Sequence, residues 1–276
     1  MKLEPEAEER ITTAELTCLR FFPHVDRRVV VVGSSMGRVG FWDIDGDGGS
    51  DGDGTGVYLY APHSGRVSGI SIQPFSLTKQ PLNTGIYFGE GEGYFMGWDE
   101  RAGKVSCSYK LHDERIDSID FNTKNTNVMA TCSADGTVCL WDLRRINARE
   151  PRKLKVHQHD YPVRSAYFSP SGNCLATTSG EYSVRVYNDD NVVEMPALGM
   201  TISLEPGAIW GWDDSHLFVG SSIKAYGIVS VPQKTITAIH SPQMNAIPRQ
   251  FATHPYRHGN LACATGRGQV ILWTSD

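Results

Sequence analysis

The sequence lacks several features that define large classes of proteins. Its longest apolar runs, such as residues 29–32, are far shorter than the ~20 residues that a membrane-spanning helix needs. The four glutamates between positions 4 and 9 are unlike the start of a signal peptide. The six cysteines include no C-x-x-C pair, and most lie among strand-like residues, where buried reduced thiols are expected. We therefore expect an intracellular protein with no membrane span and no disulfides.

An excess of positive charge is also missing. The formal net charge is -5 and the isoelectric point is about 6.0, which excludes a protein coated in positive charge for nucleic acid. A local basic patch remains compatible with these values. With 276 residues and 40% hydrophobic content, the chain is long enough to bury a substantial core.

The motifs of common enzymes and cofactor sites are incomplete. The acidic stretch 43–48 imitates the start of a calcium loop, but Gly54 stands where a bidentate glutamate is required. The glycines of 89–93 precede a further strand and alternate with two glutamates, which would repel a phosphate. No Ser, His and Asp set can be brought together from spacing alone. We predict no enzymatic activity, no metal and no cofactor.

An internal repeat dominates what the sequence does contain. Short apolar segments end in an aromatic residue at Trp42, Trp98, Trp141, Tyr187 and Trp273. These residues are spaced by 56, 43, 46 and 86 residues, and the last spacing is twice 43. A weak strand over residues 224–229 supplies the member that is missing from the long gap. The chain therefore shows six repeat units.

Each unit has the period-two alternation of strands. Its first strand carries an apolar anchor residue, as at Leu16, Val67, Ile116 and Val163, and its second strand is rich in small and β-branched residues. Second strands are expected over 128–133, 174–179 and 261–265. Four strands per unit form one blade, and blades must stack around an axis to bury both of their faces. We predict an all-β, monomeric propeller of six visible four-stranded blades over residues 14–276. The N-terminal segment 1–13 is left to supply the outer strand of the last blade.

This pattern resembles the WD-repeat family. A histidine stands four residues before the first-strand anchor in three units, at His63, His112 and His159. In WD repeats this histidine joins the aspartate of a tight turn, a serine or threonine, and the tryptophan. The resemblance thus implies that His112, Ser133, Asp135 and Trp141 form one such set, with a structural role.

Two consecutive units carry the motif W-D-x-R, as Trp98, Asp99 and Arg101 and as Trp141, Asp142 and Arg144. Paired motifs of this kind resemble those of substrate receptors of the cullin-4 RING ubiquitin ligase. That resemblance implies that both arginines contact the adaptor protein of the ligase from the underside of the propeller. The alternative is that each arginine forms a surface ion pair.

Longer segments narrow the resemblance. Residues 87–91, 98–103, 129–137 and 168–172 are similar to the family of WD repeat-containing protein 76 and damaged-DNA-binding protein two. The resemblance implies a nuclear protein that binds DNA, prefers damaged duplex and serves the DNA damage response, with chromatin proteins or histones as further partners. It also implies seven blades, one of which is missing here between Thr78 and Leu82.

Arginines cluster where the first strands begin. Arg66 and Arg115 stand one residue before the strand anchor, and Arg164 and Arg249 stand one residue after it. In a propeller these positions meet on the top face near the central channel, where guanidinium groups could bind phosphates. Arg38 and Arg267, in turns between second and third strands, extend the predicted DNA site. A peptide or histone tail remains the alternative ligand of this face.

Overall fold

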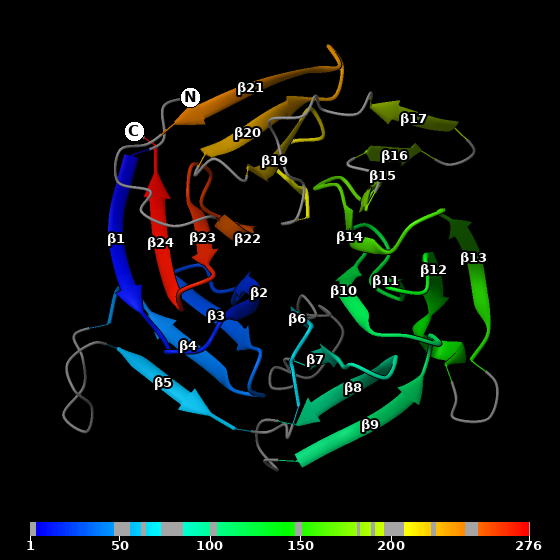
Figure 1. The fold of residues 1–276 in the computed structure, drawn as a ribbon, viewed down its shortest axis with the longest axis horizontal. Helices are drawn as coiled ribbons and strands as arrows, with labels where there is room; N and C mark the ends of the chain where they lie inside the picture. The colour runs from blue at the N-terminus through cyan, green and yellow to red at the C-terminus, as the bar shows by residue number, and fades with distance from the viewer. Residues whose placement is uncertain are drawn as a thin grey trace.

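The structure is a computed structural model. It describes residues 4–46, 56–61, 65–72, 85–99, 104–146, 151–180, 183–188, 191–195, 207–221, 225–240 and 248–275. Twenty-four strands form six antiparallel sheets of four strands, arranged as blades around a central channel (Figure 1). Within these described ranges the one helix is the short 3-10 turn η1 (Leu143–Arg145), and no helix long and apolar enough to cross a membrane occurs. The predicted all-β propeller with six blades is confirmed.

We number the blades 1 to 6 along the chain, and in each blade the first strand lies at the channel and the fourth at the outside (Figure 1). The strands of blades 1 to 3 are β2 (Leu16–Phe21), β3 (Val29–Ser34), β4 (Val39–Asp43) and β5 (Val57–Tyr60); β6 (Gly69–Ile72), β7 (Ile86–Gly89), β8 (Tyr94–Asp99) and β9 (Lys104–Lys110); and β10 (Ile116–Phe121), β11 (Val128–Ser133), β12 (Thr137–Asp142) and β13 (Lys153–Gln158). The strands of blades 4 to 6 are β14 (Val163–Phe168), β15 (Cys174–Ser179), β16 (Val184–Asn188) and β17 (Asn191–Met195); β18 (Ile209–Trp210), β19 (His216–Ser221), β20 (Ala225–Ser230) and β21 (Thr235–His240); and β22 (Pro248–Thr253), β23 (Leu261–Thr265), β24 (Gln269–Thr274) and β1 (Glu4–Arg10).

Several predicted strands have the predicted bounds. The second strands β11, β15 and β23 cover the expected residues, and the weak strand expected over 224–229 is β20. The inner strands of blades 1, 3 and 4 begin at their predicted anchors Leu16, Ile116 and Val163, whereas that of blade 2 begins at Gly69, after Val67. The position between Thr78 and Leu82, where the resemblance implies a missing blade, lies outside the described residues.

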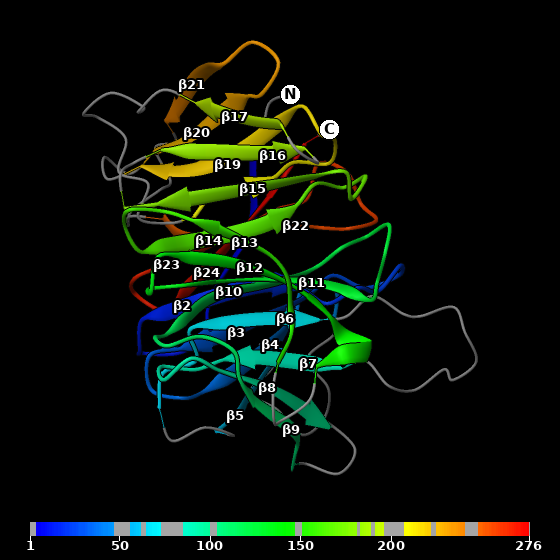
Figure 2. The ribbon, with the colours of Figure 1, turned by 90° about the vertical axis from the view of Figure 1, so that its right-hand side faces the viewer.

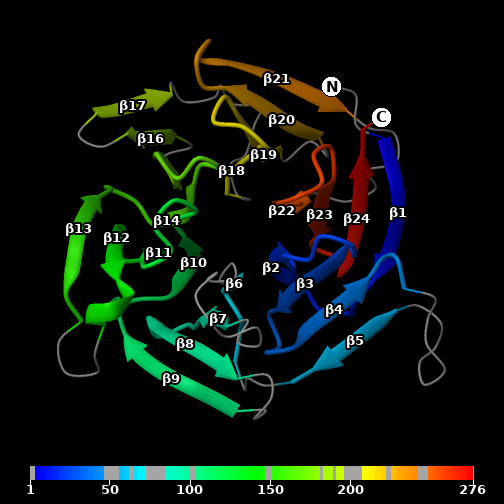
Figure 3. The ribbon, with the colours of Figure 1, turned by 180° about the vertical axis from the view of Figure 1, so that it is seen from behind.

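The ring closes through strand β1. It pairs antiparallel with β24 from Glu4 opposite Thr274 to Arg10 opposite Gln269, so the sixth blade contains both ends of the chain (Figure 3). Neighbouring inner strands contact each other all the way round, from β2 through β6, β10, β14, β18 and β22 back to β2. Six blades are therefore sufficient to close this ring.

The core lies between neighbouring sheets, because alternate residues of each strand face the next blade. Where blades 2 and 3 meet, Phe95 packs against Ile119 and Trp141, and the last two are fully buried. Close approach of the sheets requires a small residue at Gly89, where an added Cβ would lie 2.9 Å from Ile116. Large residues on inner strands therefore depend on small ones in the adjoining blade.

A group of ion pairs joins blades 6 and 1 below the closing strand. Arg28 contacts Asp45 at 2.6 Å and Glu6 of β1 at 2.7 Å. Arg257 of blade 6 lies 3.6 Å from the same Asp45 carboxylate and donates to the backbone oxygen of Asp26 at 2.7 Å. The hydrogen bonds from Arg28 hold the pKa of Asp45 below its usual value. Asp45 belongs to the acidic stretch that imitates the start of a calcium loop. In the structure its carboxylate contacts two arginines instead.

Candidate functional site

The two faces of the ring carry different parts of each blade. Seen edge-on in Figure 2, the inner strands run across the thickness of the ring. We call the upper face the one where first strands begin and where second strands turn into third strands. The lower face is the one where first strands end and where third strands lead to fourth strands. All candidate residues are described below by this division.

Four arginines, Arg66, Arg115, Arg164 and Arg249, lie at the upper mouth of the channel, and we call them the arginine group. One side is organised by Glu15 of blade 1. Its carboxylate lies 4.0 Å from Arg66 of blade 2 and 3.8 Å from Arg249 of blade 6. A single carboxylate therefore bridges arginines from the blades on either side of its own.

The other side is organised by Asp117 of blade 3. Arg115 forms two hydrogen bonds with its carboxylate, through Nε and through Nη2 at 3.0 Å, and Arg164 of blade 4 lies 3.4 Å from it. The Asp117 side chain is 11% exposed, while the four arginine side chains are between 32% and 44% exposed. The guanidinium groups are therefore held in place and still reach solvent.

The turns between second and third strands add two further cations to this face. Arg38 and Arg267 are both exposed, in the turns of blades 1 and 6. Gly37 and Gly268 beside them have φ values of 77° and 80°, which a residue with a side chain rarely adopts. The structure thus places all six predicted arginines on one face. The carboxylates of Glu15 and Asp117, which neutralise part of this charge, were not predicted.

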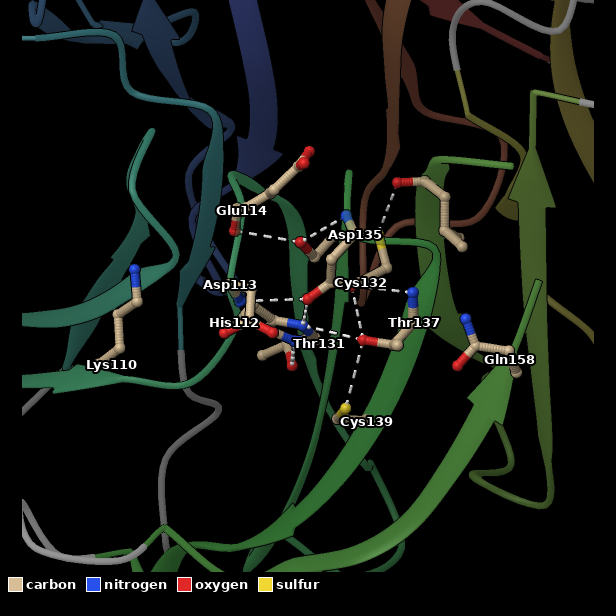
Figure 4. A network of polar contacts seen from close by, with 12 residues as sticks. Lys110, His112, Asp113, Glu114, Thr131, Cys132, Asp135, Thr137, Cys139 and Gln158 are labelled. Atoms are coloured by element: carbon tan, nitrogen blue, oxygen red, sulfur yellow. Dashed lines mark hydrogen bonds and ion pairs between the residues drawn. The ribbon is translucent and has the colours of Figure 1, made fainter. Parts of the chain in front are cut away.

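In blade 3 the histidine of the predicted polar set, His112, forms hydrogen bonds with the second strand of its blade and with the turn that follows it (Figure 4). His112 Nδ1 lies 3.0 Å from Asp135 Oδ2, and His112 Nε2 lies 2.7 Å from Thr131 Oγ1. Trp141 Nε1 donates to the same Thr131 oxygen at 2.7 Å. Burial opposes ionisation of Asp135, yet hydrogen bonds from His112 and Thr137 hold the pKa of its carboxyl well below the usual range. These side chains therefore satisfy one another's hydrogen-bonding groups within the blade.

Ser133 does not belong to that set, and the prediction that it links His112 to Trp141 is wrong. Its hydroxyl donates to the backbone oxygen of Glu114 at 3.1 Å and accepts the Asp135 N–H at 3.1 Å. Ser133 therefore stabilises the turn before the third strand, and Thr131 provides the link.

Blade 4 has a looser version of the same set. His159 Nε2 lies 3.3 Å from both Thr177 Oγ1 and Tyr187 Oη, and Nδ1 lies 3.1 Å from Arg185 Nη1. Burial, together with the charge of Arg185, lowers the pKa of His159 to about 4. The histidine is neutral at physiological pH and has a structural position. His63, the third histidine of the pattern, lies outside the described residues.

One of the two W-D-x-R motifs can be placed in full, on the lower face. Arg144 donates from Nε to Asp142 Oδ1 at 2.9 Å and from Nη2 to Oδ2 at 2.8 Å. Asp142 also accepts the backbone N–H of Arg144 at 3.0 Å and so begins η1. The Arg144 hydrogen bonds lower the pKa of Asp142 to about 2. The guanidinium is fixed by its own motif, yet its side chain is 67% exposed.

The preceding motif is only partly visible. Trp98 and Asp99 end β8, and Trp98 packs against the hydrophobic cluster between blades 1 and 2. Arg101 lies outside the described residues. Of the two predicted motifs, the structure therefore gives positions for five residues and not for Arg101: Trp98, Asp99, Trp141, Asp142 and Arg144.

The sequence matches the WD40 profile, described as WD domain, G-beta repeat, over residues 103–142 and 150–188. Each match runs from the outer strand of one blade through the three inner strands of the next. The sequence repeat is thus offset from the blade by one strand. The same offset puts β1 beside β24, because the first repeat begins with the outer strand of the last blade.

Several curated proteins are similar to this chain. WD repeat-containing protein 76 of Xenopus laevis is 25% identical over 241 residues, 72% of this chain and 40% of that protein. DNA damage-binding protein 2 of Gallus gallus is 39% identical over 88 residues, 32% of this chain and 17% of that protein. DNA damage-binding protein cmr1 of Aspergillus oryzae is 29% identical over 136 residues, 49% of this chain and 26% of that protein. The chain spans less than half the length of each relative. It is a six-bladed WD40-repeat β-propeller homologous to WD repeat-containing protein 76 and to the DNA damage-binding proteins 2 and cmr1.

Proposed function

We propose that this protein is a nuclear, DNA-associated propeller that binds duplex DNA with the arginine group of its upper face. The observation that supports the proposal is the convergence of Arg66, Arg115, Arg164 and Arg249, from four blades, on one channel mouth. Two of the similar proteins are named for binding DNA damage. We extend the proposal to damaged duplex and a role in the DNA damage response on the basis of those names.

The contacts of the arginine group favour a ligand with several negative charges. The four arginine side chains remain 32% to 44% exposed beside Glu15 and Asp117, so phosphate oxygens could contact them from solvent. A row of phosphates would contact several arginines at once, whereas a single anion would compete poorly with Glu15 and Asp117. Contacts of this kind are tolerant of sequence and sensitive to salt. An acidic peptide or histone tail is the alternative ligand that the test distinguishes.

Charge reversal tests the upper face. We expect Arg164→Glu combined with Arg249→Glu to weaken binding of a fluorescent duplex by about 100-fold at low salt, because two phosphate contacts become repulsive. Fluorescence anisotropy with intact and ultraviolet-treated duplexes measures the change. Lys124→Glu, on the lower face, is the matched charge reversal and should leave the affinity unchanged.

The outcome separates the two ligands. If the double variant keeps the affinity of the parent for duplex, this DNA site is wrong. If neither duplex binds the parent while an acidic or histone peptide does, the peptide alternative replaces the DNA proposal.

We further propose that the lower face docks the adaptor of a cullin-4 RING ubiquitin ligase, which would make the protein a substrate receptor. The specific observation is Arg144, which is anchored by two hydrogen bonds to Asp142 and still 67% exposed. A preoriented guanidinium loses little conformational freedom when a partner carboxylate or carbonyl contacts it. Because Arg144 lies on the face opposite the arginine group, DNA and the adaptor could bind at the same time.

Removal of this arginine tests the docking. We expect Arg144→Ala to reduce co-purification of the adaptor by about 10-fold or more, as is usual for an interface arginine at a hot spot. Arg27→Ala is the matched control. Arg27 is 65% exposed and pairs with Asp43, which ends the third strand of blade 1 as Asp142 ends the third strand of blade 3. An adaptor complex that survives Arg144→Ala, or that Arg27→Ala disrupts equally, would contradict the proposed docking.

A further inference from the structure

A cavity of about 270 Å³ lies at the lower end of the central channel, on the face opposite the arginine group. Residues from all six blades line it, and aromatic rings make up much of its wall: Tyr167, Trp210, Trp212 and His258. Trp212 and His258 are stacked with their ring planes 25° apart. A concave, largely apolar wall with a few polar groups is the usual form of a small-molecule site.

Arg20 carries the positive charge of this cavity. It extends from β2 in blade 1 to blade 3, where Nη2 donates to the backbone oxygen of Ile119 at 3.3 Å. Its guanidinium carbon lies 4.2 Å from the centre of the Tyr167 ring in blade 4. Nη1 donates to the backbone oxygen of Leu19 at 3.3 Å, so the side chain crosses the channel and its guanidinium lines the cavity.

Asp120 carries the negative charge. Its Oδ2 accepts the Phe168 N–H at 2.8 Å, and it directly follows Ile119, the residue that Arg20 reaches. Burial raises the pKa of Asp120 to about 6, although the charge of Arg20 opposes the shift. Among the residues that the structure describes, Arg20 and Asp120 form no ion pair with each other.

Arg20 and Asp120 therefore attract each other across one cavity without forming a direct ion pair. Because part-buried charges without a direct ionic partner are costly, such a pair favours a ligand that bridges it. An anionic ligand would be repelled by Asp120 and a cationic one by Arg20.

We propose that this cavity binds a small, flat, neutral molecule that carries an amide edge, either a primary amide or a ring lactam. Its carbonyl oxygen would accept from Arg20, and its N–H would donate to Asp120. Its ring would pack against the aromatic wall, and a volume of about 270 Å³ accommodates one ring system. The proposal does not depend on the function proposed for either face.

The test uses two probes that carry the amide edge in different settings. Benzamide offers a primary amide and uridine offers a lactam, and saturation-transfer NMR detects either one binding to the full chain. We expect at least one probe to bind with a dissociation constant in the range of about 1 mM or below. N,N-dimethylbenzamide and 3-methyluridine lack the N–H and should bind about 10-fold more weakly.

Two variants assign the contacts. Asp120→Asn keeps an oxygen to accept the Phe168 N–H but places an N–H donor toward the ligand, and should weaken the bound probe about 10-fold. Arg20→Met removes the guanidinium donors and keeps a long side chain; it should weaken the probe similarly, and it serves if Asp120→Asn does not fold. Lys104→Gln, on the exposed outer strand β9, is the control that should bind as the parent does. The proposal is overturned if neither probe binds at about 5 mM, or if the methylated probes bind equally well.

Discussion

Thr131→Val should lower the free energy of unfolding by about 3 kcal/mol, although valine has nearly the same shape as threonine. The Thr131 hydroxyl holds two buried groups at once, the Trp141 indole N–H and the His112 ring nitrogen, both at 2.7 Å. Thr131 and Trp141 are fully buried and His112 is 3% exposed, so water cannot replace the lost contacts. Equilibrium unfolding in urea, followed by tryptophan fluorescence, measures the change.

Blade 4 provides the matched control for this prediction. Thr177 occupies the position in β15 that Thr131 occupies in β11, but its contact to His159 is 3.3 Å and its blade has Tyr187 in place of the tryptophan. Thr177→Val should therefore cost about 1 kcal/mol or less. Equal losses for the two variants would contradict a larger contribution from the blade 3 network.

Removal of residues 1–10 should have a still larger effect, with a loss of about 4 kcal/mol and a melting temperature lower by about 10 °C. The deletion removes the whole ladder between β1 and β24 and leaves β24 as an exposed edge. It also removes Glu6 from Arg28, a side chain that is only 14% exposed. Differential scanning calorimetry measures the loss, and size-exclusion chromatography detects association through the new edge.

The control for the deletion keeps the backbone of β1. Glu8 accepts from Gln269 at 2.8 Å on the exposed side of the ladder, and Glu8→Gln should change the melting temperature by no more than about 2 °C. If the deleted chain melts like the parent, the ring does not depend on β1 for closure.

Much of the fold could be predicted because strand patterns are local. Leu16, Ile116 and Val163 begin inner strands, as the alternation of apolar residues around them predicts. Local patterns could not distinguish Thr131 from Ser133, because residues two apart on a strand face the same side. The choice between them depends on the distance to Trp141 on the next strand, which only the folded sheet defines.

The candidate sites were predictable only in part for a related reason. Alignment of the strands places the arginines on one face, since every blade repeats the same geometry. The partners Glu15 and Asp117 come from neighbouring blades, so no spacing within one repeat predicts their contacts. The same holds for Arg20, which crosses the channel to reach Ile119 and Tyr167 in blades 3 and 4.

The place of β1 also determines when the ring can form during synthesis. Glu4 is made before the six inner strands, and its partner Thr274 is made only after them. At about 5–20 residues per second, β1 waits for tens of seconds before β24 is available. During that interval the nascent chain exposes an unpaired strand and an unfinished blade interface, both of which promote aggregation. Synthesis therefore includes a stage at which β1 has no partner and the ring is still open.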